Sequence, residues 1–183
     1  MRNILIVEDE KLQAKIFKNF LLKFGYRVLV INNGKDFLDF YFNHNQQLEG
    51  FSILDIDVIL LDICMPKITG IEILKKTQSS SKGKVRFIVL SAISDPKTIE
   101  QAINYGADDY VIKNDKDAYI RIKVAVSNAL EKINLLTNLS DAERHKDNNL
   151  CFEDIIFSSE TMKKVMIATK AASDSNILVL VKG

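Results

Sequence analysis

Cysteine and histidine are scarce in this sequence, and neither is clustered. The 183 residues include two cysteines, Cys64 and Cys151, and two histidines, His44 and His145. A disulfide framework is therefore not expected, and the cysteine content fits a reducing compartment. The spacing of these four residues does not match that of a Cys/His metal site. The sequence thus argues against both a disulfide-stabilised domain and a structural zinc site.

An excess of charge of one sign is also absent. Lysine and arginine number 25 against 24 acidic residues, which gives a net charge of +1. The chain therefore lacks the basic footprint of a nucleic-acid-binding domain. Long hydrophobic runs are missing too, since the run at 4–7 stops at Glu8 and is too short for a signal peptide or a membrane span. We expect a soluble, cytoplasmic protein with no membrane contact.

What the sequence does contain is a regular alternation of apolar runs and helical patterns. This alternation fills roughly the first 120 residues and indicates βαβ units around a parallel sheet. The apolar runs lie at 4–7, 27–31, 58–61, 86–90 and 109–112, and the helical patterns at 11–24, 35–42, 71–77, 96–105 and 118–136. The sequence therefore predicts an α/β fold with a doubly wound, five-stranded parallel sheet. In such sheets ligands bind beyond the carboxyl ends of the strands.

Two segments carry more specific expectations. Leu12, Ile16, Phe20 and Phe24 recur every four residues, which predicts that they form the apolar stripe of the first helix. The stretch 43–55 is polar and irregular, and we interpret it as a surface insertion.

Polar side chains that can carry chemistry follow four of the predicted strands. Glu8 and Asp9 follow the first strand, Asp62 the third, Ser91 the fourth and Lys113 the fifth. Because parallel strands end at the same edge of a sheet, these side chains should converge there. Grouped carboxylates repel one another without a cation, and Mg²⁺ prefers such oxygen ligands. A carboxylate beside a cation can attack phosphorus and form an aspartyl phosphate, with the ammonium and the hydroxyl holding phosphoryl oxygens.

The residues around these positions resemble the receiver domains of two-component response regulators. The motif blocks of that family occur in order, and the resemblance covers residues 1–136. It rests on the segments 4–10 (ILIVEDE), 58–66 (VILLDICMP), 70 (G), 89–92 (VLSA) and 106–113 (GADDYVIK). Each block alone is weakly specific, but the ordered set is highly specific. The resemblance implies the flavodoxin-like (βα)5 receiver fold for this part of the chain.

The resemblance also assigns roles to residues. It implies that Asp62 is the phosphoacceptor and takes a phosphoryl group from a sensor histidine kinase. Asp9 would bind Mg²⁺ directly and Glu8 through water, and Asp62 and the backbone carbonyl of Cys64 would complete the protein ligands. The added charge of about −1.5 to −2 would be the signal.

Three further residues would respond to phosphorylation. Lys113 and Ser91 would contact the phosphoryl group, and Tyr110 would rotate inward behind it. Tyr110 could instead be an ordinary packing residue, as most aromatic residues are. Asn114 departs from the family pattern, which commonly has proline there after a cis peptide bond. A cis bond before asparagine costs about 3–4 kcal/mol, which favours a trans bond and leaves the reach of Lys113 open.

The leading hypothesis is therefore a signalling switch that is not itself an enzyme, and two alternatives stay open. The first is a phosphohydrolase with an aspartyl nucleophile. Such enzymes commonly place a general acid two residues after the nucleophile, where this chain has Cys64. The second is a phosphorylation-independent interaction or dimerisation module, which would follow if the Lys113–Asn114 departure disabled the site.

The last predicted helix carries a heptad-like pattern with two interpretations. Its apolar residues recur at spacings of four and three, and they are Ile122, Val126, Ala129, Ile133 and Leu136. The seam could pack onto the sheet of its own domain, or its second half could pair with another chain in a homodimer. It covers only about two heptads, fewer than a confident coiled-coil prediction requires.

The remaining residues point to a second domain. Residues 137–150 are polar and charged, as in a helical or polar linker. Residues 151–183 resemble the start of the AAA+ ATPase domain of NtrC-like, sigma-54-dependent activators, and we interpret them as a truncated part of it that is poorly ordered or irregularly packed. No G-x-x-x-x-G-K-[ST] motif is present, so ATP hydrolysis is not expected. Contacts with DNA and sigma-54 RNA polymerase would require domains outside this sequence.

Overall fold

The computed structural model describes residues 1–78 and 85–147, with side chains described as far as Asn138. Residues Met1–Leu136 form one compact unit. The second-domain prediction for 151–183 lies outside the described residues. Among the helices that the structure describes, none combines the length and hydrophobicity needed to cross a membrane.

Five parallel strands form one sheet in the order β2-β1-β3-β4-β5. The strands are β1 (Asn3–Val7), β2 (Arg27–Ile31), β3 (Val58–Asp62), β4 (Arg86–Ser91) and β5 (Asp109–Ile112). The strand order reverses at β1, which has β2 on one side and β3 on the other, so a crevice is expected at the carboxyl ends of β1 and β3. The predicted doubly wound parallel sheet is confirmed.

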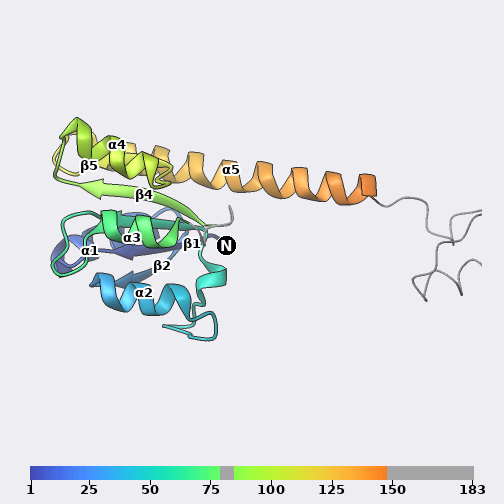
Figure 1. The fold of residues 1–183 in the computed structure, drawn as a ribbon, viewed down its shortest axis with the longest axis horizontal. Coiled ribbons are helices and arrows are strands. Elements are labelled where there is room, and N and C mark those ends of the chain that lie inside the picture. Colours follow the sequence, from blue (N-terminus) through green and yellow to red (C-terminus); the bar gives the residue numbers. More distant parts are fainter. Residues whose placement is uncertain (79–84, 148–183) are drawn as a thin grey trace, which may run out of the picture. The chain divides into compact units, whose positions relative to one another are not determined.

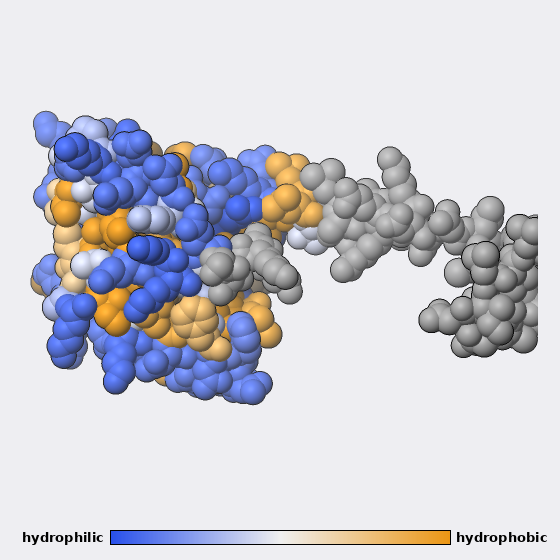
Figure 2. All heavy atoms as spheres, in the orientation of Figure 1, coloured by the Kyte–Doolittle hydropathy of each residue, from blue (hydrophilic) through white to orange (hydrophobic). Residues whose placement is uncertain are grey.

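Helices cover both faces of the sheet (Figure 1). Helices α1 (Lys11–Leu22) and α5 (Ala118–Asp147) pack on one face, and α2 (Gly34–Phe42), α3 (Gly70–Thr77) and α4 (Pro96–Asn104) on the other. Every residue of β3 is buried, as the apolar run of a central parallel strand requires. Hydrophilic residues predominate on the outer surface shown in Figure 2, with smaller hydrophobic patches between them.

Polar side chains fix the first residues of α2, α3 and α4. Asn33 caps α2 and Asp95 caps α4, each by accepting a hydrogen bond from a backbone N–H of the first turn. Thr69 and Glu72 form a reciprocal capping box at the start of α3. These caps satisfy backbone N–H groups that have no partner inside the helix. They also fix the loops that lead from the carboxyl edge of the sheet into the helices.

Three of the four residues in the apolar stripe predicted for the first helix do not face the core, so the prediction was wrong for them. Phe20, the fourth, is partly buried and packs against the core. Leu12 is 66% exposed, Ile16 43% and Phe24 39%. A strict spacing of four residues advances by about 40° per step around a helix, so such a row winds away from any flat surface. The side chains that stay on the sheet follow a mixed spacing of three and four, and they are Ala14, Phe17 and Leu21.

The stretch 43–55 is more than a surface insertion, which corrects the sequence-based interpretation. Phe51 and Ile53 are 5% and 4% exposed and belong to the core between the sheet and α2. Phe51 also pairs with Leu48 in a short antiparallel bridge, and the Arg27 guanidinium lies 4.3 Å from its ring centroid. A short 3-10 helix at Ile53–Asp55 then leads into β3. Buried side chains therefore anchor the second half of this polar stretch.

The apolar seam of α5 packs within the unit as far as Ile133. Ile122, Val126 and Ala129 are buried against the sheet, and Ile133 packs against the same cluster. These side chains are already in contact with the core, so the prediction that a homodimer uses them is corrected. Leu136, the last residue of the seam, is 46% exposed. The helix continues to Asp147, so most of the predicted linker is helical.

Gly70 allows the loop after β3 to close tightly against the strand end. A Cβ atom at this position would lie 2.3 Å from the carbonyl oxygen of Asp62 and 2.8 Å from Cα of Ile63. The Gly70 N–H also donates a hydrogen bond to the Ile63 carbonyl at 3.1 Å. Both contacts are with backbone, which cannot move aside without shifting the end of β3.

Gly70→Ala is therefore expected to destabilise the fold by about 1–3 kcal/mol, as overpacking against backbone does. Urea unfolding would measure the loss as a lower midpoint. Lys75→Ala on the exposed side of α3 is the matched control and should change stability by less than about 0.5 kcal/mol. Equal midpoints for Gly70→Ala and the wild-type chain would contradict the steric argument.

Candidate functional site

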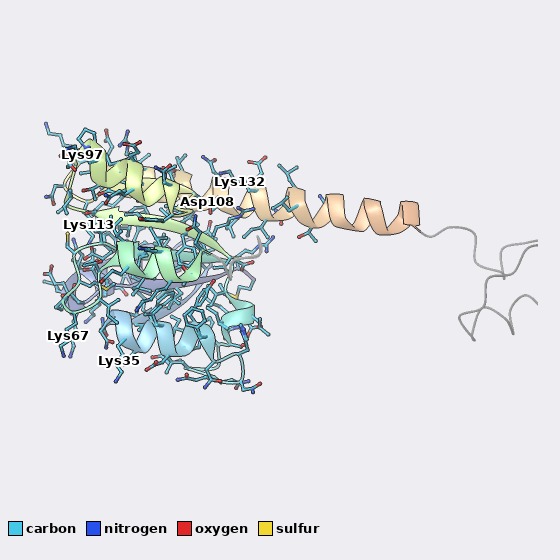
Figure 3. The ribbon with its side chains drawn as sticks, viewed as in Figure 1. Lys35, Lys67, Lys97, Asp108, Lys113 and Lys132 are labelled. Atoms are coloured by element: carbon cyan, nitrogen blue, oxygen red, sulfur yellow. The ribbon has the colours of Figure 1, made fainter. Side chains whose placement is uncertain are left out.

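The strand ends bring the predicted site residues together at one edge of the sheet. Val7 pairs with Leu61, so Glu8 and Asp62 follow at the same level of neighbouring strands. The carboxylates of Glu8, Asp9 and Asp62 each offer an oxygen within 4.8 Å of the others. Lys113 extends this group from the end of β5, where its backbone N–H donates to the Ser91 carbonyl at 2.8 Å. Figure 3 labels Lys113 at the end toward which the strands run.

Lys113 is the central cation of this site. Its Nζ lies 2.6 Å from Glu8 Oε2, 2.9 Å from Asp62 Oδ2 and 3.1 Å from Gln13 Oε1. The side chains of Lys113 and Asp62 are each 5% exposed, and that of Glu8 is 2% exposed. Buried charges need partners of this kind, because water cannot solvate them. The ammonium therefore neutralises part of the negative charge that the strand ends collect.

The neutralisation of Glu8 is incomplete. Burial raises the pKa of Glu8 to about 7; the hydrogen bond from Lys113 opposes this rise, and the charge of Asp62 adds to it. A carboxyl group with such a pKa is only partly ionised at neutral pH. The site therefore favours further positive charge next to Glu8.

Asp62 and Ser91 are held by the backbone of the loops that follow them. The Cys64 N–H donates to Asp62 Oδ1 at 3.1 Å. The Ile93 N–H donates to Ser91 Oγ at 3.0 Å, and Ser91 is fully buried. The Cys64 thiol lies 3.9 Å from the Ser91 hydroxyl. The carboxylate and the hydroxyl thus have fixed orientations on neighbouring strands.

Tyr110 is partly buried next to this arrangement. Its hydroxyl donates a hydrogen bond to the Ile93 carbonyl at 2.8 Å, and its ring packs against the core. Burial raises the pKa of this phenol above its ordinary value, so it stays protonated at neutral pH. Ile93 therefore links the Tyr110 hydroxyl to the Ser91 hydroxyl, through its carbonyl on one side and its N–H on the other.

The departure at Asn114 does not remove Lys113 from the site. In the described part of the chain every peptide bond is trans, including the one before Asn114. Lys113 nevertheless reaches both Glu8 and Asp62. The Lys113 ammonium therefore reaches the site with a trans peptide bond before Asn114.

Four of the predicted site residues, Glu8, Asp9, Asp62 and Lys113, line a pocket of about 520 Å³ together with other residues, some of which the sequence did not indicate. Gln13 is the most important of these, because it contacts Lys113 directly. It belongs to no family motif, although its place in the first turn of α1, four residues after Asp9, could have suggested it. The further lining residues are Glu10, Cys64, Ala92 and Asn114.

The carboxylate group has the chemistry of a magnesium site. Glu8, Asp9 and Asp62 offer only oxygen ligands, which a hard divalent cation prefers. Their mutual repulsion and the raised pKa of Glu8 also favour a bound cation. The residues present therefore fit Mg²⁺.

Comparisons with known proteins agree with this geometry. The model of the response regulator receiver domain family matches residues 4–125. The luminescence regulatory protein LuxO of Vibrio campbellii is 27% identical over 178 residues, which cover 97% of this chain and 36% of LuxO. The chain thus spans about a third of the length of this relative.

Solved structures show the same fold. A response regulator receiver domain protein from Clostridium thermocellum superposes with a TM-score of 0.63 and 24% identity, over 74% of this chain and 99% of that one. The response regulator TrrA of Thermotoga maritima, solved in complex with Mg(2+)-BeF, gives a TM-score of 0.54 and 28% identity over 68% and 96% of the two chains. Together with the family match over most of its length, the sheet order and the acidic site, this shows that the chain belongs to the response regulator receiver domain family.

Proposed function

We propose that this chain is a phosphorylation-dependent switch in which Asp62 accepts a phosphoryl group from a sensor histidine kinase. The observation that carries the proposal is the position of Asp62, whose Oδ2 lies 2.9 Å from the Lys113 ammonium in the pocket that Glu8 and Asp9 also line. A nucleophilic carboxylate, a cation for phosphoryl oxygens and a metal-binding pair of acids are the parts that phosphoryl transfer requires.

The positions of Asp62 and Lys113 define the steps of phosphoryl transfer. An oxygen of Asp62 attacks the phosphorus of the kinase's phosphohistidine, a new P–O bond forms, and the P–N bond breaks with its electron pair returning to the imidazole. Lys113 then donates to a phosphoryl oxygen and stabilises the charge that develops there. Glu8, Asp9, Asp62 and the Cys64 carbonyl would hold Mg²⁺, which supplies further positive charge next to the phosphoryl oxygens when bound.

Ser91 and Tyr110 would transmit the change. A hydroxyl that turns toward the phosphoryl group gives up its present bond with the Ile93 N–H, which is 3.0 Å long. Tyr110 contacts the carbonyl of the same residue. Because both bonds meet at Ile93, a change at Ser91 alters the environment of Tyr110 and of the surface beside α4.

The first test is phosphorylation by acetyl phosphate in the presence of Mg²⁺, followed by intact mass. The wild-type chain is expected to gain one labile phosphoryl group, and Asp62→Asn none, because an amide is not a nucleophile toward phosphorus. Asp39→Asn, which changes an exposed aspartate on α2, is the matched control and should be phosphorylated normally. An adduct on Asp62→Asn that equals the wild-type adduct would place the acceptor elsewhere.

Mg²⁺ binding should depend on pH through Glu8. Its pKa of about 7 means that the proton must leave before the carboxylate can bind the ion, so affinity should rise by about tenfold between roughly pH 6 and pH 8. Isothermal titration would measure this together with the released proton. Glu8→Gln is expected to bind more weakly and without this pH dependence. A wild-type affinity that is constant over this range would show that Glu8 does not titrate on binding.

The two alternatives predict different results. A phosphohydrolase would turn over phosphate esters repeatedly, and Cys64 stands where its general acid would be expected. A phosphorylation-independent module would gain no phosphoryl group at all. The ion pairs of Lys113 with Glu8 and Asp62 favour the switch over this second alternative, because the site is assembled despite Asn114.

We also propose that the chain acts on a transcription-activating output domain and that residues 151–183 are the start of that domain. The similarity to LuxO supports this, since it extends over 97% of the chain and therefore beyond the segment that matches the receiver family. Contacts with DNA or RNA polymerase would belong to such an output region. The cognate kinase would contact the receiver.

Of the predicted seam, the end of α5 beyond Ile133 is left for pairing with a second chain, and Leu135 and Leu136 there are 57% and 46% exposed. Changing both to lysine is expected to lower the sedimenting mass of the full chain if this surface pairs. Ile120→Lys, at an exposed position near the start of α5, is the control. Monomer masses for the wild-type chain and both variants would argue against a homodimer.

A further inference from the structure

The Lys113 ammonium has a third partner for which the proposed chemistry gives no role. An ammonium group carries three N–H donors. Nζ donates to the Glu8 carboxylate at 2.6 Å and to the amide oxygen Oε1 of Gln13 at 3.1 Å, and it forms an ion pair with Asp62 at 2.9 Å. Glu8 and Asp62 lie at strand ends, whereas Gln13 comes from the first turn of α1. The three acceptors therefore hold Nζ from three separate elements of the fold.

Little else can replace Gln13 at this position. The Lys113 side chain is 5% exposed, so water has little access to its donors. Gln13 is partly buried and lines the same pocket as Glu8, Asp9 and Asp62. A lysine side chain has four rotatable bonds, and it keeps one orientation only where its donors are all satisfied. Loss of the amide oxygen would leave one donor of a nearly buried ammonium without its acceptor.

Gln13 differs from the other two acceptors in what happens to it during phosphorylation. Asp62 becomes an acyl phosphate when its oxygen bonds to phosphorus, and a phosphoryl oxygen then takes over its ion pair with Lys113. Glu8 is one of the acids expected to serve Mg²⁺. The amide of Gln13 is neutral and takes part in neither step. It is thus the one acceptor of the three whose chemistry stays the same before and after phosphoryl transfer.

We propose that Gln13 is a positioning residue, which keeps the Lys113 ammonium directed at the phosphoryl group while the other two acceptors change partners. This rests on the proposed function, because it assumes that Lys113 contacts the phosphoryl group. The residue type fits the role: an amide accepts the hydrogen bond without adding negative charge beside an anionic phosphoryl group. A carboxylate at the same place would compete for the ammonium and repel the substrate.

The test compares phosphorylation rates of the full chain with acetyl phosphate at saturating Mg²⁺, followed by intact mass. Gln13→Met keeps a side chain of similar length and removes the acceptor. Asn19→Met makes the same kind of change at an exposed position of the same helix and is the matched control. Gln13→Met is expected to lower the maximal rate by about tenfold, the effect of one lost hydrogen bond to a charged group. The half-saturating acetyl phosphate concentration should remain at its wild-type value, because Lys113 acts mainly in the transition state. The melting temperature should fall, because one donor of a nearly buried ammonium loses its acceptor.

A second comparison separates positioning from a structural effect. In a Lys113→Met chain the group that Gln13 holds is gone, so adding Gln13→Met should slow phosphorylation no further. A second loss as large as the first would overturn the proposal, as would equal maximal rates for Gln13→Met and wild type or an equal loss in Asn19→Met. A wild-type chain that gains no phosphoryl group would refute the proposed function itself. An adduct at equal rates on wild type and Gln13→Met would refute only the role of Gln13.

Discussion

The ion pairs of Lys113 with Glu8 and Asp62 are the interactions on which this site depends. Each of the three side chains is at least 95% buried, as the exposed fractions of 5%, 2% and 5% require. A charge buried that deeply is costly unless an opposite charge meets it, so removing Lys113 would leave two buried carboxylates without their cation. The pairs also join the ends of β1, β3 and β5, and thus link the middle of the sheet to one of its edges. In the proposed function, the same ammonium that stabilises the resting site would contact the phosphoryl group on Asp62.

The fold and most of the site followed from local patterns in the sequence. β1 and β3 are continuous apolar runs that end in acids, and parallel pairing alone brings such ends together. Ser91 and Lys113 were predicted in the same way, from their places after β4 and β5. These positions depend only on where a strand ends, which composition and turn residues mark clearly. Their roles in phosphoryl transfer rest on the family resemblance and on the proposal made from the geometry.

Features that depend on side-chain direction were less accessible. The stripe of Leu12 and Ile16 is as apolar as the row of Phe17 and Leu21, and only packing on the sheet decides which of them is buried. The place of Gln13 four residues after Asp9 was only a weak signal, because an amide in the first turn of a helix is ordinary until its distance to a buried ammonium is known. The seam of α5 allowed two outcomes for the same reason, since a heptad pattern specifies an apolar face but not the surface that covers it.

The connection between α2 and β3 is a place where the chain can become longer or shorter without changing the fold. Phe51 packs with Leu48 and the Arg27 guanidinium beside β2, at the edge of the sheet, whereas Glu8 and Asp62 sit on the two strands nearest its middle. Lengthening a connection costs little chain entropy, and side chains such as Ile53 return part of that cost by joining the core. Residues can therefore accumulate between α2 and β3 over evolutionary time without refitting the acidic site. A lineage can diversify this edge of the receiver while the chemistry at its centre stays under separate selection.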